Sequence, residues 1–545
     1  MAIFMNKTKL KKYSFITAII LALFMVVGII YDKYSSIFIP FTKPLEIIDI
    51  FISFTFWISL IWLVIFSLYS YLDNYKYHKP HKLSIFRRHP FLSIFILTFS
   101  ISLIYFVIFY PGIVTWDGFW QLDMYYGIRA MSNHHPAFLS VIMGLLADLG
   151  RFLINDNFGI SLFIIIQMLF NAFVYSYTIK VLSKLKIPNF LYNIIIIFYA
   201  AFPLLSLYSV TYIKDTLFYL TSLLIFVFQY NNLVLENNHN KSTYIILTLL
   251  YILLILLRNT GIYIAVISLI TLILYYRKKV TLIFKRMSII FSIVTVFQIG
   301  YNILIYQVLD VNHASVREML SIPLQQTARY LKSYPDDLNE EEKEAIDNLF
   351  TVDITELGEL YNPNKSDPIK WKFKSNATTE ELLNYFKAWF TMFLKHPGTY
   401  VDATLNNTYG YFYPGMLNSI EEGLGFFEIE DNTRVNAGYL DISFNTSTHA
   451  AREFIYNMSD TLSKIPILGK IYYCSTYTWA LIAITIYLLY KRYHELLVYC
   501  APLYMGIIVC LISPLNAHMR YLIPVAICIP VLIAFVFHRK ANAKK

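Results

Sequence analysis

Two carboxylates, two histidines and two tryptophans fall close together between positions 110 and 136. Asp117 stands between Trp116 and Trp120, and Asp123 follows six residues later. A carboxylate held between apolar rings at a membrane surface is partly desolvated, which raises its pKa and suits it to taking a proton from a hydroxyl group. We therefore expect Asp117 to act as a general base, with a solvated loop acid as the alternative. Asp123 is a weaker candidate.

Next along the chain, His134 and His135 precede Pro136. Proline suits the first turn of a helix and pushes His135 out of the α region, so the His135 side chain should lie just ahead of free backbone N–H groups. Such a helix start is an anion site. We expect His134 and His135 to contact phosphate or substrate, with simple placement at the membrane interface as the alternative. Adjacent histidines do not share a helix face, so a bidentate metal site is not expected.

Four further charged residues stand at the ends of apolar runs. Lys214 and Asp215 begin one such run, where a favourable acid at a helix N-terminus and a snorkelling lysine are the alternative explanation. Arg258 is isolated among leucines and is costly to place in an apolar environment, which favours phosphate binding. Arg520, two residues after His518, is either a snorkelling anchor or a second phosphate contact.

The composition excludes a soluble protein. Of 545 residues, 57% are hydrophobic and only 15% are charged, whereas soluble domains carry about a quarter charged residues. The chain is therefore predicted to be an all-α polytopic membrane protein. The four cysteines lie in apolar runs, which indicates packing rather than a disulfide framework, and we find neither an internal repeat nor a nucleic-acid motif.

Apolar stretches able to cross about 30 Å of hydrocarbon occur twelve times. They are 14–31, 47–72, 91–110, 158–180, 189–208, 216–235, 243–257, 261–276, 287–307, 472–490, 495–513 and 520–537. The short pair on either side of Arg258 has a single bent hairpin as its alternative. The apolar run 136–150 is short and is expected to lie at the interface.

Charge tests this layout, because loops on the cytoplasmic side are enriched in Lys and Arg. With the N-terminus inside, the inner segments hold 24 Lys and Arg and three acids, and the outer segments hold the other 21 basic and 32 acidic residues. We expect both termini to be cytoplasmic, in the plasma membrane of a bacterium, with the basic excess facing anionic lipid. All the candidate residues then share the outer face.

Four regions follow from these spans. We expect an N-terminal two-helix anchor with a basic cytoplasmic loop over 1–90, a seven-helix core over 91–307 with its first outer loop at 111–157, an extracytoplasmic domain over 308–471, and a C-terminal three-helix segment over 472–545. The extracytoplasmic domain should be mainly helical, since 339–350 has a charged helical face and Thr378 precedes a capping-box pattern. The aromatic turn 409–415 is either a packed loop or a platform for stacking a sugar.

In this order, the features resemble the GT-C superfamily of polyprenyl-phosphate-dependent membrane glycosyltransferases, particularly its protein-mannosyltransferase-like and aminoarabinose-transferase-like branch. The counterparts are the acid Asp117 in the first outer loop, His135-Pro136 at the start of an interfacial helix, the acid Asp215, and Arg520-Tyr-Leu-Ile-Pro524 near the end. The chain departs from the pattern where paired acids become Asp117-Gly118 and where His-Pro-Pro becomes His-Pro-Ala. In outline it is most similar to an uncharacterised Gram-positive multi-pass branch with a Ser-Asn-His-His-Pro motif.

The resemblance implies an enzyme that moves a sugar from a polyprenyl-phosphate donor to a hydroxyl of a cell-envelope acceptor. Asp117 would act as base, while Arg258, Lys214, His135 and Arg520 would hold the carrier phosphate. No cofactor is required; a divalent cation, if one is used, would be held by Asp117 and Asp215, where the departure at Gly118 weighs against it. The rival hypotheses are a transporter or flippase for a lipid-linked solute and a polymerase or ligase of surface polysaccharide. Expected partners are membrane lipid, the lipid-linked sugar and its acceptor, and no nucleic acid.

Overall fold

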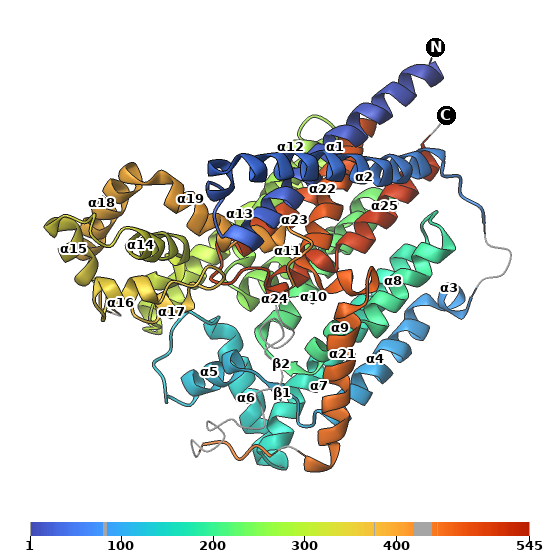
Figure 1. Ribbon diagram of the computed structural model, residues 1–545. Coiled ribbons are helices and arrows are strands. Elements are labelled where there is room, and N and C mark those ends of the chain that lie inside the picture. The colour runs from blue at the N-terminus through green and yellow to red at the C-terminus, as the bar shows by residue number, and fades with distance from the viewer. Residues whose placement is uncertain (1, 80–83, 375, 418–438, 444, 544–545) are drawn as a thin grey trace.

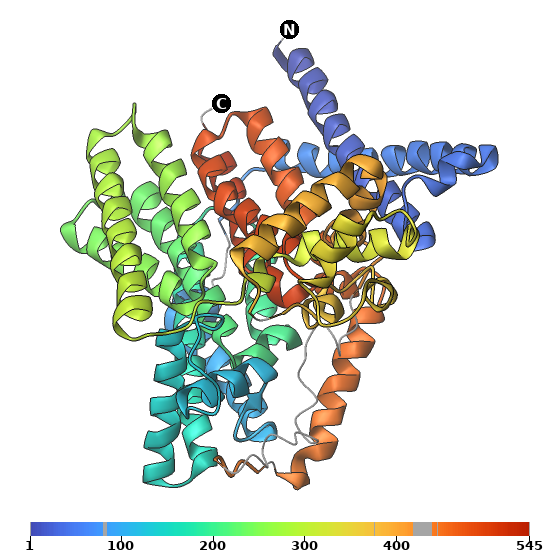
Figure 2. The same cartoon turned by 90° about the vertical axis from the view of Figure 1, so that its left-hand side faces the viewer.

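The computed structural model describes residues 2–79, 84–374, 376–417, 439–443 and 445–543. It is a helical membrane protein, as predicted (Figure 1). The N- and C-termini lie near one another at one end of the molecule, and helices α5 and α6 lie at the opposite end (Figures 1 and 2).

The α-helices of the first half are α1 (Ala2–Tyr34), α2 (Pro44–Asn74), α3 (Ile85–Arg88), α4 (Pro90–Ile108), α5 (Trp116–Tyr125), α6 (Ala137–Leu153), α7 (Asp156–Ser183), α8 (Asn189–Ala201), α9 (Pro203–Ser209), α10 (Lys214–Gln229), α11 (Lys241–Leu257), α12 (Gly261–Tyr276) and α13 (Thr281–Ile303). Those of the second half are α14 (Ser321–Ser333), α15 (Glu340–Asp347), α16 (Ile354–Glu359), α17 (Asp367–Lys370), α18 (Thr379–Lys395), α19 (Pro397–Asn406), α21 (His449–Lys464), α22 (Cys474–Lys491), α23 (His494–Leu511), α24 (Met519–Ala526) and α25 (Ile529–Asn542). Short 3-10 or π turns are η1 (Ile39–Thr42), η2 (Tyr230–Leu235), η3 (Leu304–Val308), η4 (Val316–Met319), η5 (Tyr409–Tyr411), η7 (Thr446–Thr448) and η8 (Leu468–Tyr472). Two strands are present, β1 (Ile113–Val114) and β2 (Thr211–Tyr212).

Eight helices in the described part of the chain are long and apolar enough to cross a membrane. They are Lys7–Tyr34, Pro44–Asn74, Pro90–Ile108, Asp156–Ser183, Lys214–Leu235, Thr281–Val308, His494–Leu511 and Met519–Asn542. The pair α8 and α9 meets the same test only if its 46° bend is counted within one span. The remaining predicted stretches coincide with α11, α12 and α22, which are helical without meeting the criteria for a span.

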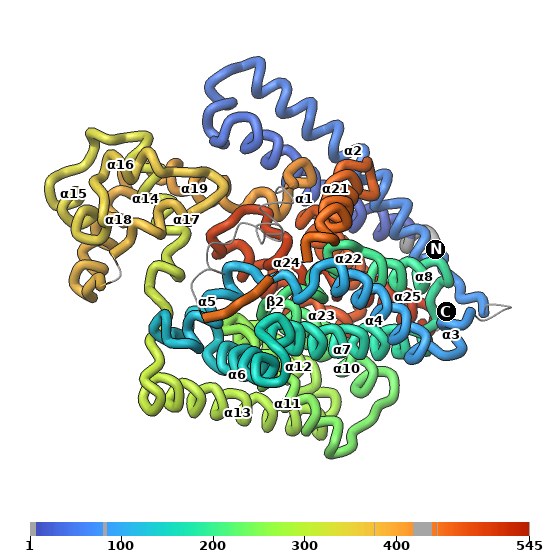
Figure 3. The backbone as a smooth tube through the Cα atoms, turned by 90° about the horizontal axis from the view of Figure 1, so that it is seen from below, coloured from blue at the N-terminus to red at the C-terminus, as the bar shows by residue number. Residues whose placement is uncertain are grey.

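Most buried side chains belong to one large core among the membrane helices. A second core is formed by residues between 320 and 400, contributed by helices α14 to α19 and the turns between them. These helices form a lobe beside the membrane helices (Figure 3). Within the predicted region 308–471, α21 does not share this second core; it packs against α4 and α9, and its Ile455 belongs to the large core.

Helix starts in the lobe follow the sequence signals. Capping boxes at Asn339 with Glu342 and at Thr378 with Glu381 begin α15 and α18, so both expected helices are confirmed. The aromatic turn after α19 is packed, because Tyr409, Tyr411 and Tyr413 are all buried. The packed-loop alternative therefore holds for this turn.

The two short strands set the positions of the helices that follow them. β1 and β2 pair in parallel, Ile113 with Thr211 and Val114 with Tyr212. Each pair of residues is fully or almost fully buried. Because α5 starts two residues after β1 and α10 starts two residues after β2, this ladder brings the first turns of α5 and α10 side by side.

Candidate functional site

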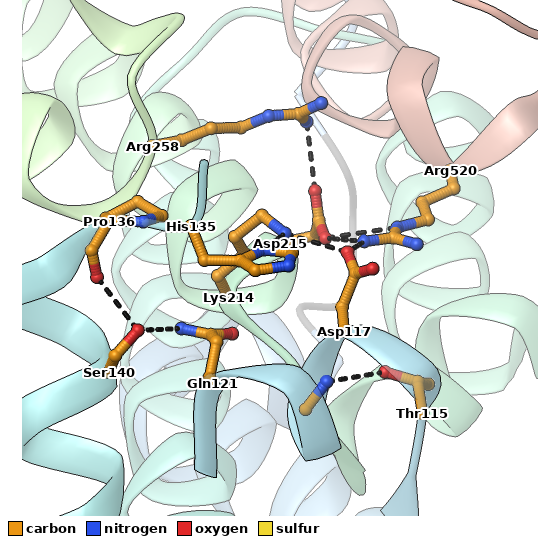
Figure 4. Close-up of polar contacts among 11 residues, drawn as sticks. Thr115, Asp117, Gln121, His135, Pro136, Ser140, Lys214, Asp215, Arg258 and Arg520 are labelled. Carbon is orange, nitrogen blue, oxygen red and sulfur yellow. Dashed lines mark hydrogen bonds and ion pairs between the residues drawn. The ribbon is translucent and has the colours of Figure 1, made fainter. Parts of the chain in front are cut away.

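Five charged side chains form a network where the ends of α5, α10, α11 and α24 meet (Figure 4). The Lys214 ammonium donates to a carboxylate oxygen of Asp117 at 2.7 Å, and Arg258 donates to Asp215 at 2.9 Å. Arg520 contacts Asp215 at 2.7 Å and also contacts Asp117. Three cations thus surround two carboxylates, leaving one net positive charge.

The β ladder sets the position of Asp117 through Gly118. A Cβ on Gly118 would stand 2.5 Å from the backbone oxygen of Tyr212, so only glycine allows α5 to pack this closely on β2. The Thr115 hydroxyl accepts from the Gly118 N–H and caps the helix. The departure from paired acids at Asp117-Gly118 therefore has a steric reason.

The turn before α10 is fixed by Gln167 of α7. Its side-chain amide donates to the carbonyl oxygens of Tyr208, Ser209 and Thr211 at 2.9 to 3.1 Å. Gln167 is fully buried. This contact holds the backbone that leads into Lys214, so the side chain acts as part of the scaffold of the site.

Arg520 is positioned by the segment that precedes it. Asn516 donates from its backbone N–H to the Asn364 carbonyl at 3.0 Å and from its side chain to the Asn406 carbonyl at 2.7 Å, and it accepts from the Gly410 N–H. The Ser366 N–H donates to the Pro514 carbonyl. The lobe therefore braces the start of α24.

Arg258 follows the last residue of α11, and a turn closed by the Gly261 N–H on the Arg258 carbonyl leads into α12. Arg258 therefore lies in the turn between two helices, α11 and α12. Its guanidinium lies over the rings of Phe218 and Tyr521, 5.6 and 5.3 Å from their centroids. These contacts with aromatic faces stabilise the cation at the boundary of the apolar region.

The expected elevated pKa of Asp117 is wrong. Burial by itself raises the pKa of the Asp117 carboxyl, but the Arg520 guanidinium and the Lys214 ammonium beside it hold the pKa well below its ordinary value. Local sequence shows the apolar neighbours of Asp117 but not these two cations, which come from positions about 100 and 400 residues away. Asp117 is therefore a stable carboxylate among these cations.

His135 belongs to the same network. Lys214 lies 2.8 Å from Nδ1 of His135, and because an ammonium only donates, this nitrogen accepts and the ring is neutral with its proton on Nε2. Burial and then the charge of Lys214 hold the pKa of His135 well below 6.5. Among the described residues Nε2 has no hydrogen-bond partner. The site therefore holds a buried N–H donor.

The other predicted residues lie around this network. The His134 ring contacts those of His135 and Trp120, with centroids 4.6 and 6.2 Å apart, and burial lowers its pKa. Asp123 points elsewhere: it pairs with Arg129 at 3.3 Å and accepts from the Tyr439 hydroxyl.

One of the first N–H groups of α6 is engaged by another helix. The Phe138 N–H already donates to the Tyr301 hydroxyl at 3.4 Å, and the Ser140 N–H donates to the Pro136 carbonyl. The His135 ring joins the network through its contact with Lys214, and the anion site expected at this helix start stays a prediction.

A divalent cation does not fit the two acids as they stand. The described residues contain no group of three or more His, Cys, Asp or Glu side chains able to hold a metal ion. Asp117 and Asp215 both face Arg520, and each has a further cation of the chain against it. The cationic N–H donors that surround the two acids suit an anion.

Sequence reasoning missed a second charged group beside the first. Lys370 pairs with Glu318 at 2.6 Å and with Asp367 at 3.5 Å. Trp371 lies against Trp120, with ring centroids 5.9 Å apart, and under Arg317 at 4.8 Å. Only the rise of charge density after position 308 signalled this group.

Comparison with curated proteins and with solved structures found no match to this chain. One family model, described as a family of unknown function (DUF6020), matches residues 127–545. The match begins ten residues after Asp117 and includes His134, His135, Lys214, Asp215, Arg258 and Arg520. Since it covers more than three quarters of the chain, the protein belongs to the DUF6020 family.

Proposed function

We propose that this protein is a GT-C-type glycosyltransferase that moves a sugar from a polyprenyl-phosphate donor to a hydroxyl of a cell-envelope acceptor. The observation that carries the proposal is the network itself. Three cations and a buried neutral histidine surround the carboxylates of Asp117 and Asp215, where the helices of the site meet. A site of this kind suits an anionic lipid headgroup and a proton transfer next to it.

The donor phosphate binds to Lys214, Arg258 and Arg520. Charge-assisted hydrogen bonds to phosphate oxygens are short and strong, and guanidinium groups offer two N–H donors at once. The three cations exceed the two acids by one charge, so an arriving phosphate is attracted. Nε2–H of His135 is a further donor of the same site.

A small apolar pocket lies between the helices that carry the cations. It is lined by residues of α10, α11, α12, α23 and α24, including Leu254, Leu503 and Val525. Leu254 lies about one helical turn from Arg258, and Val525 a little more than one turn from Arg520. The helices that carry the cations thus also wall the pocket, which has room for only about two water molecules, so these helices must separate to admit the first isoprene units of the carrier.

In the transfer step the acceptor oxygen attacks C1 of the sugar. The bond between C1 and the phosphate oxygen breaks, its electron pair stays with the phosphate, and Asp117 takes the acceptor proton. The cations stabilise the charge that develops on the leaving phosphate. When the phosphate draws Lys214 and Arg520 toward itself, the pKa of Asp117 rises and the carboxylate becomes a better base.

The proposal includes the topology that the charge pattern predicts. The chain crosses the plasma membrane of a bacterium twelve times with both termini inside, and the network faces outward. α22 and the shorter α11 and α12 are then spans in addition to the longer helices. The core helices adopt a GT-C arrangement.

The test uses the full chain in lipid nanodiscs. Undecaprenyl phosphate should bind and should compete with a radiolabelled undecaprenyl-phosphate sugar, and an envelope extract as acceptor should receive the label. A transporter would move the labelled lipid across proteoliposomes without releasing the carrier phosphate. Binding and translocation with an intact sugar–phosphate bond would therefore contradict the enzyme. Transfer to a growing polysaccharide alone would identify the polymerase or ligase alternative.

A further inference from the structure

Helix α18 has two apolar faces. Tyr385 and Met392 on one side belong to the second core, and Ala388 beside them is buried. On the opposite side Leu383, Phe386, Phe390 and Leu394 are exposed, with Leu383 58%, Phe390 54% and Leu394 62% accessible in the described part of the chain. A helix that is apolar on both faces needs a cover on each.

The exposed residues form one stripe. Leu383, Phe390 and Leu394 follow each other at intervals of seven and four residues, which align on one side of a helix. Polar side chains follow at the edge of this stripe, with Lys387 beside it and Asn384 further round. Lysine beside an apolar stripe is typical of a helix that lies in a membrane interface, where its amine extends to the headgroups.

The helix that follows the stripe contacts the segment that leads into a candidate membrane span. Gly398, at the start of α19, lies against the ring of Phe38. A Cβ atom added to Gly398 would stand only 2.9 Å from a carbon of this ring. Phe38 precedes η1, whose Phe41 is 53% exposed, and Leu45 at the start of the candidate span α2 is 78% exposed. Figure 1 shows α19 beside the start of α2, with α18 next to it. The apolar surface therefore continues from a membrane helix toward the lobe.

We propose that α18 lies in the headgroup and acyl boundary of the bilayer leaflet on the side of the candidate site. The occupant of its exposed face is lipid, and a second copy of the chain is the competing cover. The placement holds the lobe against the membrane, so that the residues bracing Arg520 are anchored at both α18 and α2. It does not depend on the reaction assigned to the site.

The experiment attaches a nitroxide spin label to single cysteines introduced by L383C, F390C and L394C, each in the full chain in nanodiscs of phosphatidylcholine with phosphatidylglycerol. The four natural cysteines are buried, so the parental chain treated with the same reagent should take up little label and serves as the background measurement. N384C is the matched control, since Asn384 is exposed on the polar side of the same helix. Collision rates with dissolved oxygen and with a water-soluble nickel chelate are compared at each position.

Labels on the stripe should collide with oxygen several-fold more often than with the nickel chelate, and the label at 384 should show the reverse. Equal access of the chelate at 390 and 384 would place the stripe in water and overturn the proposal. Protection of 390 from both reagents, together with spin–spin broadening between copies, would show a protein partner and overturn it too. All the labelled positions are exposed, so the variants keep the core of the lobe intact.

Discussion

The guanidinium of Arg520 contacts one carboxylate oxygen of Asp215 through two nitrogen atoms, Nε at 3.1 Å and Nη2 at 2.7 Å, although 305 positions separate the two residues. Asp215 is 2% exposed and also accepts from Arg258. One carboxylate therefore pairs with two guanidinium groups, one from the middle of the chain and one from near its C-terminal end. Removing it leaves buried positive charge without compensation.

For this reason Asp215→Asn should destabilise the protein by about 3–5 kcal/mol, the usual range when one partner of a buried ion pair is lost. The measurement is the thermal unfolding midpoint of the full chain in nanodiscs. Glu236→Gln is the control, because Glu236 pairs with Lys184 on the surface and such pairs contribute at most about 1 kcal/mol. Equal shifts for both variants would contradict the role given to Asp215.

Gly118→Ala should reduce transfer strongly while the chain still folds. The new Cβ meets the Tyr212 backbone oxygen, so α5 must move away from β2 and carry Asp117 away from Lys214. The matched control is Gly300→Ala in α13, where nothing lies within 4 Å of the added carbon. Alanine there should preserve activity and stabilise the helix slightly. Parental activity in Gly118→Ala would show that the tight packing is dispensable.

The helices and several charged residues of the site could be predicted from the sequence, because they depend on local patterns. Runs of apolar residues gave the membrane helices, and capping boxes gave the starts of α15 and α18. A charge inside an apolar run is costly, so Arg258, isolated among leucines, stood out, while Lys214, Asp215 and Arg520 were noticed because they share the predicted outer face with it.

What the sequence did not give depends on pairing between distant segments. The low pKa of Asp117 follows from Arg520, 403 positions away, and no local pattern encodes that contact. The same holds for the ladder between β1 and β2, whose strands have two residues each and carry no alternating pattern. Asp123 is close to Asp117 in the sequence but does not join the network, because its carboxylate contacts Arg129 and the distant Tyr439.

Stability should fall as the pH drops from 7.5 to 5.0. Burial and then Arg520 lower the pKa of His518 to about 3, and the pKa of His135 is also well below 6.5. Below about pH 6.5 the unfolded chain binds protons at these positions and the folded chain does not, so each histidine costs up to about 1.4 kcal/mol per pH unit. The thermal midpoint of His518→Gln should therefore depend less on pH over this range. The lowered pKa of Asp117 acts only below about pH 4, outside this window.

Reporter fusions test the orientation. A fusion after Lys279, between α12 and α13, should report the cytoplasm, and one after Lys365, in the lobe, should report the exterior. The reason is the excess of Lys and Arg in the segments assigned to the inner side. Lys82 and Lys545, where cytoplasmic signals are also expected, lie outside the described residues. An exterior signal at Lys279 would overturn the proposed number of spans.

The chemical role of Asp117 is tested by comparing two variants. Asp117→Asn keeps the size of the side chain but removes its ability to accept a proton, so transfer should fall by roughly 10²-fold or more. Undecaprenyl phosphate should still bind, because Arg258 and Lys214 remain. Arg258→Ala should instead weaken this binding by about tenfold or more, since it removes a charge-assisted contact.

Asp123→Asn is the control, because Asp123 lies on the same helix and its contacts are with Arg129 and Tyr439. It should transfer sugar at close to the parental rate. All three variants are compared at equal amounts of folded protein, judged by the thermal midpoint. A transporter has no need of a proton acceptor at position 117, whereas a sugar transfer to a hydroxyl does. If folded Asp117→Asn transfers sugar at the parental rate, the base must be sought elsewhere in the network, and Asp215 and His135 are the next groups to replace.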